Sequence, residues 1–201
     1  MRAAVYEGIG NIQLRTVPDP ELPRDGVLMK VRSAAICGTD VRTFRHGSPF
    51  FEPPWIIGHE IAGEVVSVDK SVNTVKPGDR VTVAAGIPCG TCEPCARGWM
   101  HLCRNVKAHG FHYSGGFAEL MPMSSETVRH SGISIIPDHV EFDEAALTEP
   151  LSCVLNGQEL VDVTVGDTVV VIGAGPIGCM HVEVARLRGA SKIILVEVNP
   201  E

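Results

Sequence analysis

The chain has 201 residues, of which 24 are acidic and 17 are Lys or Arg, so its formal net charge is −7. With 44% hydrophobic and 20% charged residues it can bury a sizeable core, and extended disorder is not expected. The negative charge and the lack of a basic run argue against nucleic acid or an anionic membrane surface as a partner. Glycines and a proline interrupt the longest apolar stretch, near residues 168–180, so no membrane span is expected. These features favour a small-molecule partner.

The N-terminal segment does not resemble a signal peptide, because Glu7 follows closely and no long apolar segment is present. The seven cysteines are explained better by metal-ligand spacing in a reducing compartment than by secreted disulfides. We therefore expect a cytoplasmic protein.

Residues up to about 135 contain short apolar runs, such as 27–31, 63–68 and 81–85, separated by Gly, Pro, Asn and Asp. This pattern is typical of many short strands in a barrel or a sandwich. Around residues 138–143 the pattern changes, and helical segments are predicted as far as about Leu160.

Four cysteines, Cys89, Cys92, Cys95 and Cys103, follow one another with gaps of two, two and seven residues. This spacing can place four thiolates around one zinc ion, and a closed four-cysteine site is structural because it lacks an open coordination position. A disulfide framework or a chance cluster is the alternative. We predict a structural zinc lobe over residues 86–105.

Residues 168–197 predict one βαβ unit. An unbroken apolar run at 168–172 is typical of a buried parallel strand, and a second apolar strand is expected at 192–196. Between them, Ile177, Met180, Val184 and Leu187 recur at helical spacing, and Gly189 stands where a left-handed C-terminal cap would fall.

A Gly-x-Gly-x-x-Gly loop joins the first of these strands to the helix. Its glycines would allow a tight turn, close approach to a pyrophosphate and close helix packing. Glu197 ends the second strand, where a carboxylate can bind both ribose hydroxyls and would repel a 2′-phosphate, so NAD is predicted over NADP. A glycine-rich turn that binds nothing is the alternative. The expected cofactor-binding residues are Gly173, Gly175, Pro176, Ile177, Gly178 and Glu197.

A second metal site is suggested by Cys37, His59, Glu60 and Glu149, which come from three separate segments. Thiolate, imidazole and carboxylate are the ligands of open catalytic zinc sites, which keep one position for water or substrate. Taken singly, each signal is modest, because a lone cysteine is more often a small buried hydrophobe and a lone histidine a satisfied core residue.

These motifs together resemble the zinc-containing medium-chain dehydrogenase/reductases. The landmarks in family order are Cys37-Gly-Thr-Asp, Gly58-His-Glu-Ile-Ala-Gly-Glu, Pro77-Gly-Asp-Arg-Val, the four-cysteine lobe, Gly115-Gly-Phe-Ala-Glu, Glu149-Pro-Leu-Ser and Gly173-Ala-Gly-Pro-Ile-Gly. Glu149, where other members have a second cysteine, is similar to the sorbitol, polyol and threonine dehydrogenase branch. The resemblance implies a GroES-like β-barrel catalytic domain followed by a Rossmann doubly wound sheet, with zinc in the cleft between them. We expect residues 1–150 to form the first domain and 151–201 the start of the second.

The resemblance also implies roles for single residues. Cys37 and His59 would bind the catalytic zinc directly, and Glu60 and Glu149 would exchange with water as further ligands. Thr39 would relay the substrate proton while hydride passes to NAD. Two zinc ions per chain and a homo-oligomeric parent protein are expected.

Two departures from the family pattern concern the relay and the length. Arg42 stands where related enzymes often have a histidine, and it cannot shuttle protons, so water, the ribose hydroxyls or His46 would complete the relay. The nucleotide domain needs a sheet of about six strands, of which two are predicted here. We therefore assign to the parent protein the oxidation of a secondary alcohol: a polyol, sugar alcohol or hydroxy amino acid. The activity of the 201-residue chain alone is left open.

Two other functions compete with this one: a non-catalytic zinc-binding remnant of the fold, and a zinc-independent reductase of the same fold. Phe44, Phe50, Phe51 and Trp55 could line a pocket or pack at the base of a loop, and packing is the more frequent case. Cys153 and Cys179 are expected to be small buried hydrophobes without chemistry.

Overall fold

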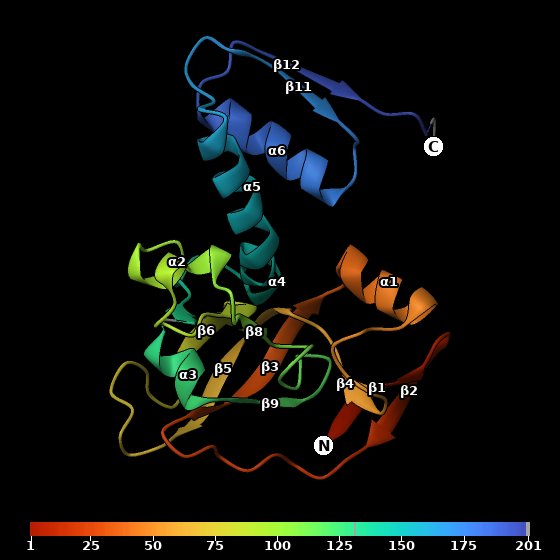
Figure 1. Cartoon of the computed structure of the whole chain (residues 1–201), viewed down its shortest axis with the longest axis vertical. Helices are drawn as coiled ribbons and strands as arrows, with labels where there is room; N and C mark the ends of the chain where they lie inside the picture. The colour runs from red at the N-terminus through yellow and green to blue at the C-terminus, as the bar shows by residue number, and fades with distance from the viewer. Residues whose placement is uncertain (131, 200–201) are drawn as a thin grey trace. The chain divides into compact units, whose positions relative to one another are not determined.

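The computed structural model describes residues 1–130 and 132–199, which form two compact units, Met1–Leu147 and Thr148–Glu201 (Figure 1). Each unit is described below by itself.

Antiparallel sheets make up most of the first unit. The larger sheet has the strand order β10-β6-β5-β3-β9, with β3 (Val27–Ala35), β5 (Glu60–Val68), β6 (Arg80–Val83), β9 (Leu120–Met123) and β10 (Ile133–Ile135). A second sheet has the order β2-β1-β4, with β1 (Arg2–Gly8), β2 (Asn11–Thr16) and β4 (Trp55–Ile56), and a two-stranded ribbon pairs β7 (Gly86–Ile87) with β8 (Lys107–Ala108). The short strands predicted from the apolar runs are confirmed.

The main core lies on one face of the five-stranded sheet. Side chains alternate along each strand, so Val27 and Met29 of β3 point to the same face, and both are fully buried. They pack with Ile61 of β5, Val81 of β6 and Met121 of β9. Full burial of an aliphatic side chain of this size contributes about 1.5–3 kcal/mol relative to exposure.

The strand ladders among the described residues do not close into the complete barrel that the resemblance implies. The segment before β9 connects the two sheets by single hydrogen bonds: the Ala4 N–H donates to the Phe117 carbonyl and the Val31 N–H to the Glu119 carbonyl. The Glu119 N–H also donates to the Arg2 carbonyl at 3.1 Å, so the segment meets β1 in an isolated bridge, Ala3 with Ala118. The junction is irregular because residues 115–117 also bond back to residues 56–58.

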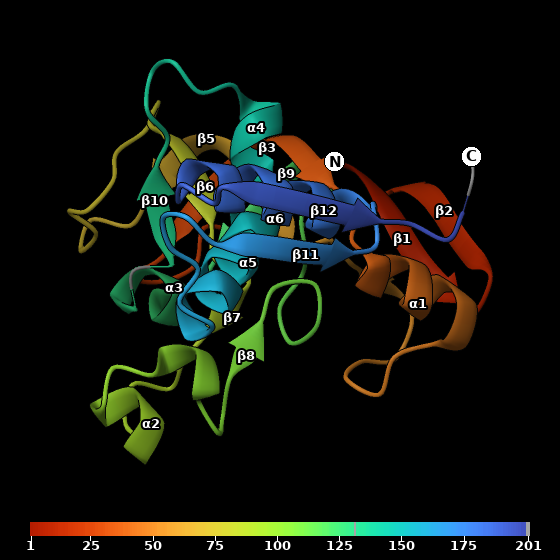
Figure 2. The ribbon, with the colours of Figure 1, turned by 90° about the horizontal axis from the view of Figure 1, so that it is seen from above.

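Five short helices accompany these sheets. They are α1 (Gly38–His46), α2 (Glu93–Ala96), the 3₁₀ helix Met100–Leu102, α3 (Ser125–Arg129) and α4 (Phe142–Ala146). The ribbon in Figure 2 shows α4 beside β3 and β5, where Ala145 and Ala146 are buried against Ala62. The Thr82 hydroxyl is buried there and contacts the carbonyls of Ile61 and Ala145 at 3.0 and 3.2 Å, which satisfies an inward polar group.

The second unit consists of α5 (Thr148–Leu160), β11 (Thr168–Ile172), α6 (Pro176–Leu187) and β12 (Lys192–Val196). The two strands are parallel, from Thr168 opposite Lys192 to Ile172 opposite Val196, which confirms the predicted βαβ unit. Gly189 has φ +88°, the left-handed conformation predicted after the helix.

One sequence-based expectation fails in the second unit. Cys153 and Cys179 are exposed and not buried, because they lie on the solvent-exposed faces of α5 and α6. The apolar strands keep exposed side chains, such as Val170 and Ile172, because a two-stranded parallel unit leaves open the faces that further strands would bury. None of the helices in the described ranges is both long enough and apolar enough to cross a bilayer.

Candidate functional site

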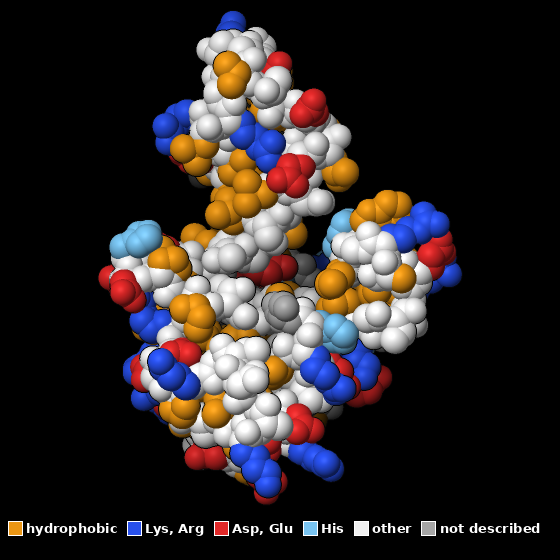
Figure 3. All heavy atoms as spheres, turned by 90° about the vertical axis from the view of Figure 1, so that its left-hand side faces the viewer, with side chains coloured by type: hydrophobic (Ala, Val, Ile, Leu, Met, Phe, Trp, Pro, Cys, Tyr) orange, Lys and Arg blue, Asp and Glu red, His pale blue; other side chains and the backbone are white. Residues whose placement is uncertain are grey.

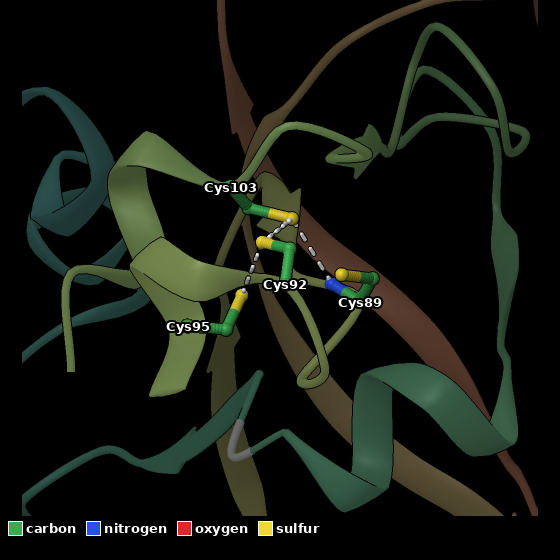
Figure 4. A group of neighbouring side chains, drawn as sticks. All are labelled: Cys89, Cys92, Cys95 and Cys103. Carbon is green, nitrogen blue, oxygen red and sulfur yellow. Dashed lines mark hydrogen bonds between the residues drawn. The ribbon is translucent and has the colours of Figure 1, made fainter. Parts of the chain in front are cut away.

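The four predicted lobe cysteines converge at one point, as Figure 4 shows. Cys92 precedes α2, Cys95 lies within it, and Cys89 and Cys103 come from the segments on either side. All four sulfur atoms lie within 4.8 Å of one another, with Cys92 Sγ 3.4 Å from Cys95 Sγ, and no disulfide joins them. Four thiols this close are a donor set of the kind that structural zinc binds.

Backbone N–H groups already point at these sulfur atoms. The Cys89 and Asn105 amides donate to Cys103 Sγ at 3.2 and 3.4 Å. Hydrogen bonds from the backbone of Thr91 and Cys92 lower the pKa of Cys89 to about 5, whereas burial and the neighbouring sulfurs raise the pKa of Cys95 to about 12. Such crowding favours a bound cation, because a divalent metal ion deprotonates its thiol ligands.

A second ligand group consists of Cys37, His59 and Glu60, whose ligand atoms also lie within 4.8 Å of one another. The register of the sheet explains the meeting, because Ala35 at the end of β3 pairs with Glu60 at the start of β5. Cys37 follows two residues later as the N-terminal cap of α1. His59 and Glu60 are buried, at 6% and 5% exposed, and Cys37 is half-buried, so the group is shielded from bulk water on the side of the sheet alone.

Asp40 is a functional residue that the sequence reasoning missed. Its carboxylate is 5% exposed and accepts the Cys37 N–H at 2.9 Å and the Gly58 N–H. Burial raises the pKa of Asp40, while the hydrogen bond from Cys37 opposes that rise. The other oxygen lies 3.8 Å from His59 Nδ1, which leaves Nε2 as the imidazole nitrogen available to a metal. Asp40 stands three residues after Cys37 at the start of a helix, which is a capping-box spacing. This spacing is the signal by which the sequence could have pointed to Asp40.

The remaining residues predicted for this centre are placed as follows. Thr39 Oγ1 lies 3.6 Å from Cys37 Sγ, and Thr39 is exposed. Arg42 and His46 lie on α1 and are exposed. Glu149 belongs to the second unit, at the start of α5, so its role as a fourth ligand remains a proposal.

The aromatic residues before β4 divide into two groups. Phe51 stacks on Trp55 with ring centroids 5.5 Å apart and meets the buried Tyr6 edge-on, so these two rings are packing. Phe50 is 59% exposed and meets Phe111 edge-on at 5.8 Å.

Phe111 in turn contacts the His59 ring at 5.5 Å. Phe50 therefore belongs to an aromatic wall beside the metal-ligand group. Phe111 was not predicted, because nothing in its spacing connects it with His59.

Close backbone packing fixes this wall. The Gly115 N–H donates to the Ile56 carbonyl at 2.8 Å and the Gly116 N–H to the Gly58 carbonyl at 3.0 Å. A Cβ on Gly115 would lie 2.3 Å from the Gly58 carbonyl oxygen, so only glycine allows this approach. The loop carrying Phe111 is thus anchored to the residues that immediately precede His59.

The glycine loop of the second unit has the geometry of a dinucleotide-binding turn. Gly173 has φ +101°, which favours glycine. A Cβ on Gly175 would meet nothing within 4 Å, so the backbone is open to a ligand at the start of α6. A Cβ on Gly178 would lie 1.9 Å from the Gly173 carbonyl oxygen, so the helix packs onto the turn only with glycine there. Pro176 and Ile177 form the first turn of α6 between these glycines.

Glu197 follows β12 and bonds to the same loop. One carboxylate oxygen accepts the Ala174 N–H at 2.7 Å, and the other accepts those of Val198 and Asn199 at 2.7 and 2.9 Å. These N–H groups lower the pKa of Glu197, so the side chain is a carboxylate at neutral pH. A carboxylate has about four acceptor positions, so acceptor capacity remains for a ligand hydroxyl.

Comparison with known proteins identifies the family. Residues 23–133 match the family described as the alcohol dehydrogenase GroES-like domain. The chain belongs to this family. Its resemblance to the zinc-containing medium-chain dehydrogenase/reductases is thereby confirmed.

Similar proteins include sorbitol dehydrogenase of Bacillus subtilis (strain 168), 37% identical over all of this chain and 56% of the relative. L-threonine 3-dehydrogenase of Chelativorans sp. (strain BNC1) is 40% identical over 93% of this chain and 54% of the relative. A solved structure from Sinorhizobium meliloti 1021, described as a zinc-binding dehydrogenase bound to NADP, has a TM-score of 0.88 and 39% identity, covering 96% of this chain and 55% of its own. The chain thus spans about half the length of the curated relatives it matches.

Proposed function

We propose that the parent protein is a zinc-dependent oxidoreductase that transfers hydride from a secondary alcohol to NAD. The observation that carries this proposal is the open group of Cys37, His59 and Glu60, which provides three ligand atoms within 4.8 Å, with His59 and Glu60 buried. Catalytic zinc sites use three protein ligands and leave a position for the reacting molecule. The names of the relatives support a polyol, a sugar alcohol or a hydroxy amino acid as the substrate.

The donor set fits zinc. Sulfur, imidazole nitrogen and carboxylate oxygen are its common ligands, and the carboxylate of Asp40 beside His59 Nδ1 is the usual partner of a zinc-binding histidine. When bound, zinc supplies a Lewis acid that lowers the pKa of a coordinated hydroxyl group. Cys37 and His59 would hold the ion, and Glu60 and Glu149 would serve as exchangeable ligands.

Thr39 is the group that we expect to take the proton from the substrate hydroxyl. Its own hydroxyl is 3.6 Å from Cys37 Sγ and exposed, so it connects the centre with water. Arg42 on the same helix stays protonated and cannot pass the proton onward. Solvent, the ribose hydroxyls or His46 would complete the path.

NAD is the proposed cofactor, held by the loop from Gly173 to Gly178 and by Glu197. The ionised Glu197 would repel a 2′-phosphate. The Sinorhizobium meliloti relative binds NADP. The preference of this protein for NAD over NADP is therefore tested directly below. We also propose one structural zinc on Cys89, Cys92, Cys95 and Cys103, a homo-oligomeric parent protein and a cytoplasmic location.

The test is the zinc content of the full-length parent protein, measured together with alcohol oxidation with NAD and with NADP. We expect about two zinc ions per chain, falling to about one in Cys37→Ala, which should also lose activity. Cys153→Ala, outside both ligand groups, is the matched control and should keep both ions. One ion that Cys37→Ala does not remove would favour a non-catalytic zinc-binding remnant. Tighter binding of NADP than of NAD would overturn the cofactor assignment.

A further inference from the structure

His112 lies at the exposed rim of the aromatic wall beside the Cys37, His59 and Glu60 group. Its ring is 5.7 Å from Phe50, at an angle of 46°. Phe50 contacts Phe111, and Phe111 contacts His59, so the four rings form one continuous cluster. The cluster therefore joins a polar, solvent-accessible group to the candidate metal centre through two apolar rings.

The hydrogen bonding of His112 determines which nitrogen can meet a ligand. The Ala108 N–H donates to His112 Nδ1 at 3.2 Å, so Nδ1 acts as an acceptor. A neutral imidazole whose Nδ1 accepts has its proton on Nε2. Nε2–H is therefore the donor that His112 offers at the rim of the cluster.

The main chain holds this donor in place. The His112 and Tyr113 N–H groups both donate to the Ala108 carbonyl, at 2.8 and 3.1 Å, and the Gly110 N–H donates to the Tyr113 carbonyl at 2.8 Å. Gly110 has φ +80°, which suits this tight turn. Together with the anchored glycines that follow, these bonds fix the backbone that carries the ring, and the Ala108 N–H holds Nδ1, which lowers the entropic cost of recognition.

We propose that His112 is a specificity-determining residue that selects polyols at this site. Its Nε2–H donates a hydrogen bond to a second hydroxyl of the substrate, while the carbon chain lies against Phe50 and Phe111. A polyol presents oxygen acceptors along a chain of C–H groups, which matches one donor beside two apolar rings. This inference rests on the function proposed above and adds its substrate class.

The test compares two substrates with the zinc-loaded full-length protein: a hexitol, and a six-carbon secondary alcohol with a single hydroxyl. His112→Ala should lower kcat/KM for the hexitol about 10-fold, mainly through KM, because one hydrogen bond is lost. The monohydroxy alcohol should change less than about two-fold by the same reasoning. His112→Asn, which keeps a donor, should recover part of the loss, and the exposed His139→Ala is the matched control.

Binding without turnover gives a second reading. With histidine labelled at Cε1 and no cofactor present, the hexitol should shift the NMR signal of His112 and leave that of His139 in place. An unchanged substrate ratio in His112→Ala, or an unshifted His112 signal, would overturn the inference while leaving the dehydrogenase function intact. A wild-type protein that oxidises neither alcohol would overturn the proposed function and the inference with it.

Discussion

Asp40 lies 3.8 Å from His59, measured between Oδ1 and Nδ1, and its other oxygen accepts the N–H of Cys37. One buried carboxylate therefore contacts the side chain of one predicted metal ligand and the backbone of another. At 3.8 Å the first contact is too long for a hydrogen bond, so it is an electrostatic contact between the carboxylate and the imidazole. Asp40 thus contacts both Cys37, three residues earlier, and His59, about twenty residues later in the chain.

Replacing Asp40 by Asn should weaken metal binding at this centre. The substitution keeps the shape and one acceptor but removes the charge beside the imidazole. Loss of such an outer partner typically lowers metal affinity about 10- to 100-fold. Competition with a chromogenic chelator would measure the effect, and the four-cysteine lobe should keep its ion. Asp69→Asn is the control, because Asp69 is a half-buried carboxylate outside both ligand groups that accepts the Ser71 N–H and hydroxyl. An unchanged metal affinity in Asp40→Asn would show that Asp40 acts only as a helix cap.

Cys95→Ser should remove one zinc ion and loosen the lobe. Cys95 is 7% exposed, and its sulfur lies 3.4 Å from that of Cys92. With serine in its place, a hydroxyl replaces one of the four thiolates and only three remain to bind zinc. The lobe has little other core, and structural zinc contributes folding energy directly. We expect faster tryptic cleavage after the exposed Arg97 and Arg104. Cys179→Ser, at an exposed position outside both ligand groups, should show wild-type zinc content and cleavage.

Local motifs were predictable from the sequence, and long-range contacts were not. The cysteine lobe and the glycine loop each encode their chemistry within about fifteen residues, where spacing and turn residues determine the structure. The contact of Phe111 with His59 depends instead on how glycines 58 and 115 pack, and no periodicity reports that packing. The exposure of Cys153 was predicted wrongly for a similar reason, since an apolar neighbourhood in sequence does not decide which helix face is covered.

His109 should make the stability of the first unit depend on pH. Its ring is fully buried with Nε2 3.2 Å from the Thr127 hydroxyl, and burial lowers its pKa to about 4, below the ordinary 6.5. Between pH 6.5 and 4 the unfolded chain binds a proton that the folded chain excludes. Stability is therefore complete above about pH 6.5 and falls as the pH drops toward 4, by about 3 kcal/mol in total.

Urea unfolding of wild type and His109→Gln at pH 7 and pH 4.5, with chelator in every sample, would measure this contribution. The chelator keeps zinc loss from adding its own pH dependence. His109→Gln should be less stable at pH 7, because it disturbs a packed site, yet should lose about 2–3 kcal/mol less than wild type on going to pH 4.5. Equal losses in the two proteins would show that His109 does not govern the acid sensitivity.

Gly175 and Gly178 should respond differently to alanine, although both belong to the same loop. At Gly178 a Cβ would lie 1.9 Å from the Gly173 carbonyl oxygen, so the turn and α6 must separate and the second unit should lose stability. At Gly175 the φ of −68° suits alanine and a Cβ meets no atom within 4 Å, so Gly175→Ala should cost less than about 1 kcal/mol.

The methyl group of Gly175→Ala would nevertheless occupy the open space over the start of α6, where a pyrophosphate is expected to approach the backbone. NAD binding should therefore weaken in both variants, but only Gly178→Ala should lower the thermal midpoint appreciably. Fluorescence titration with NADH and thermal unfolding of the full-length protein would separate the two effects. Wild-type NADH affinity in a folded Gly175→Ala protein would place the cofactor elsewhere, because no dinucleotide could then lie against this turn.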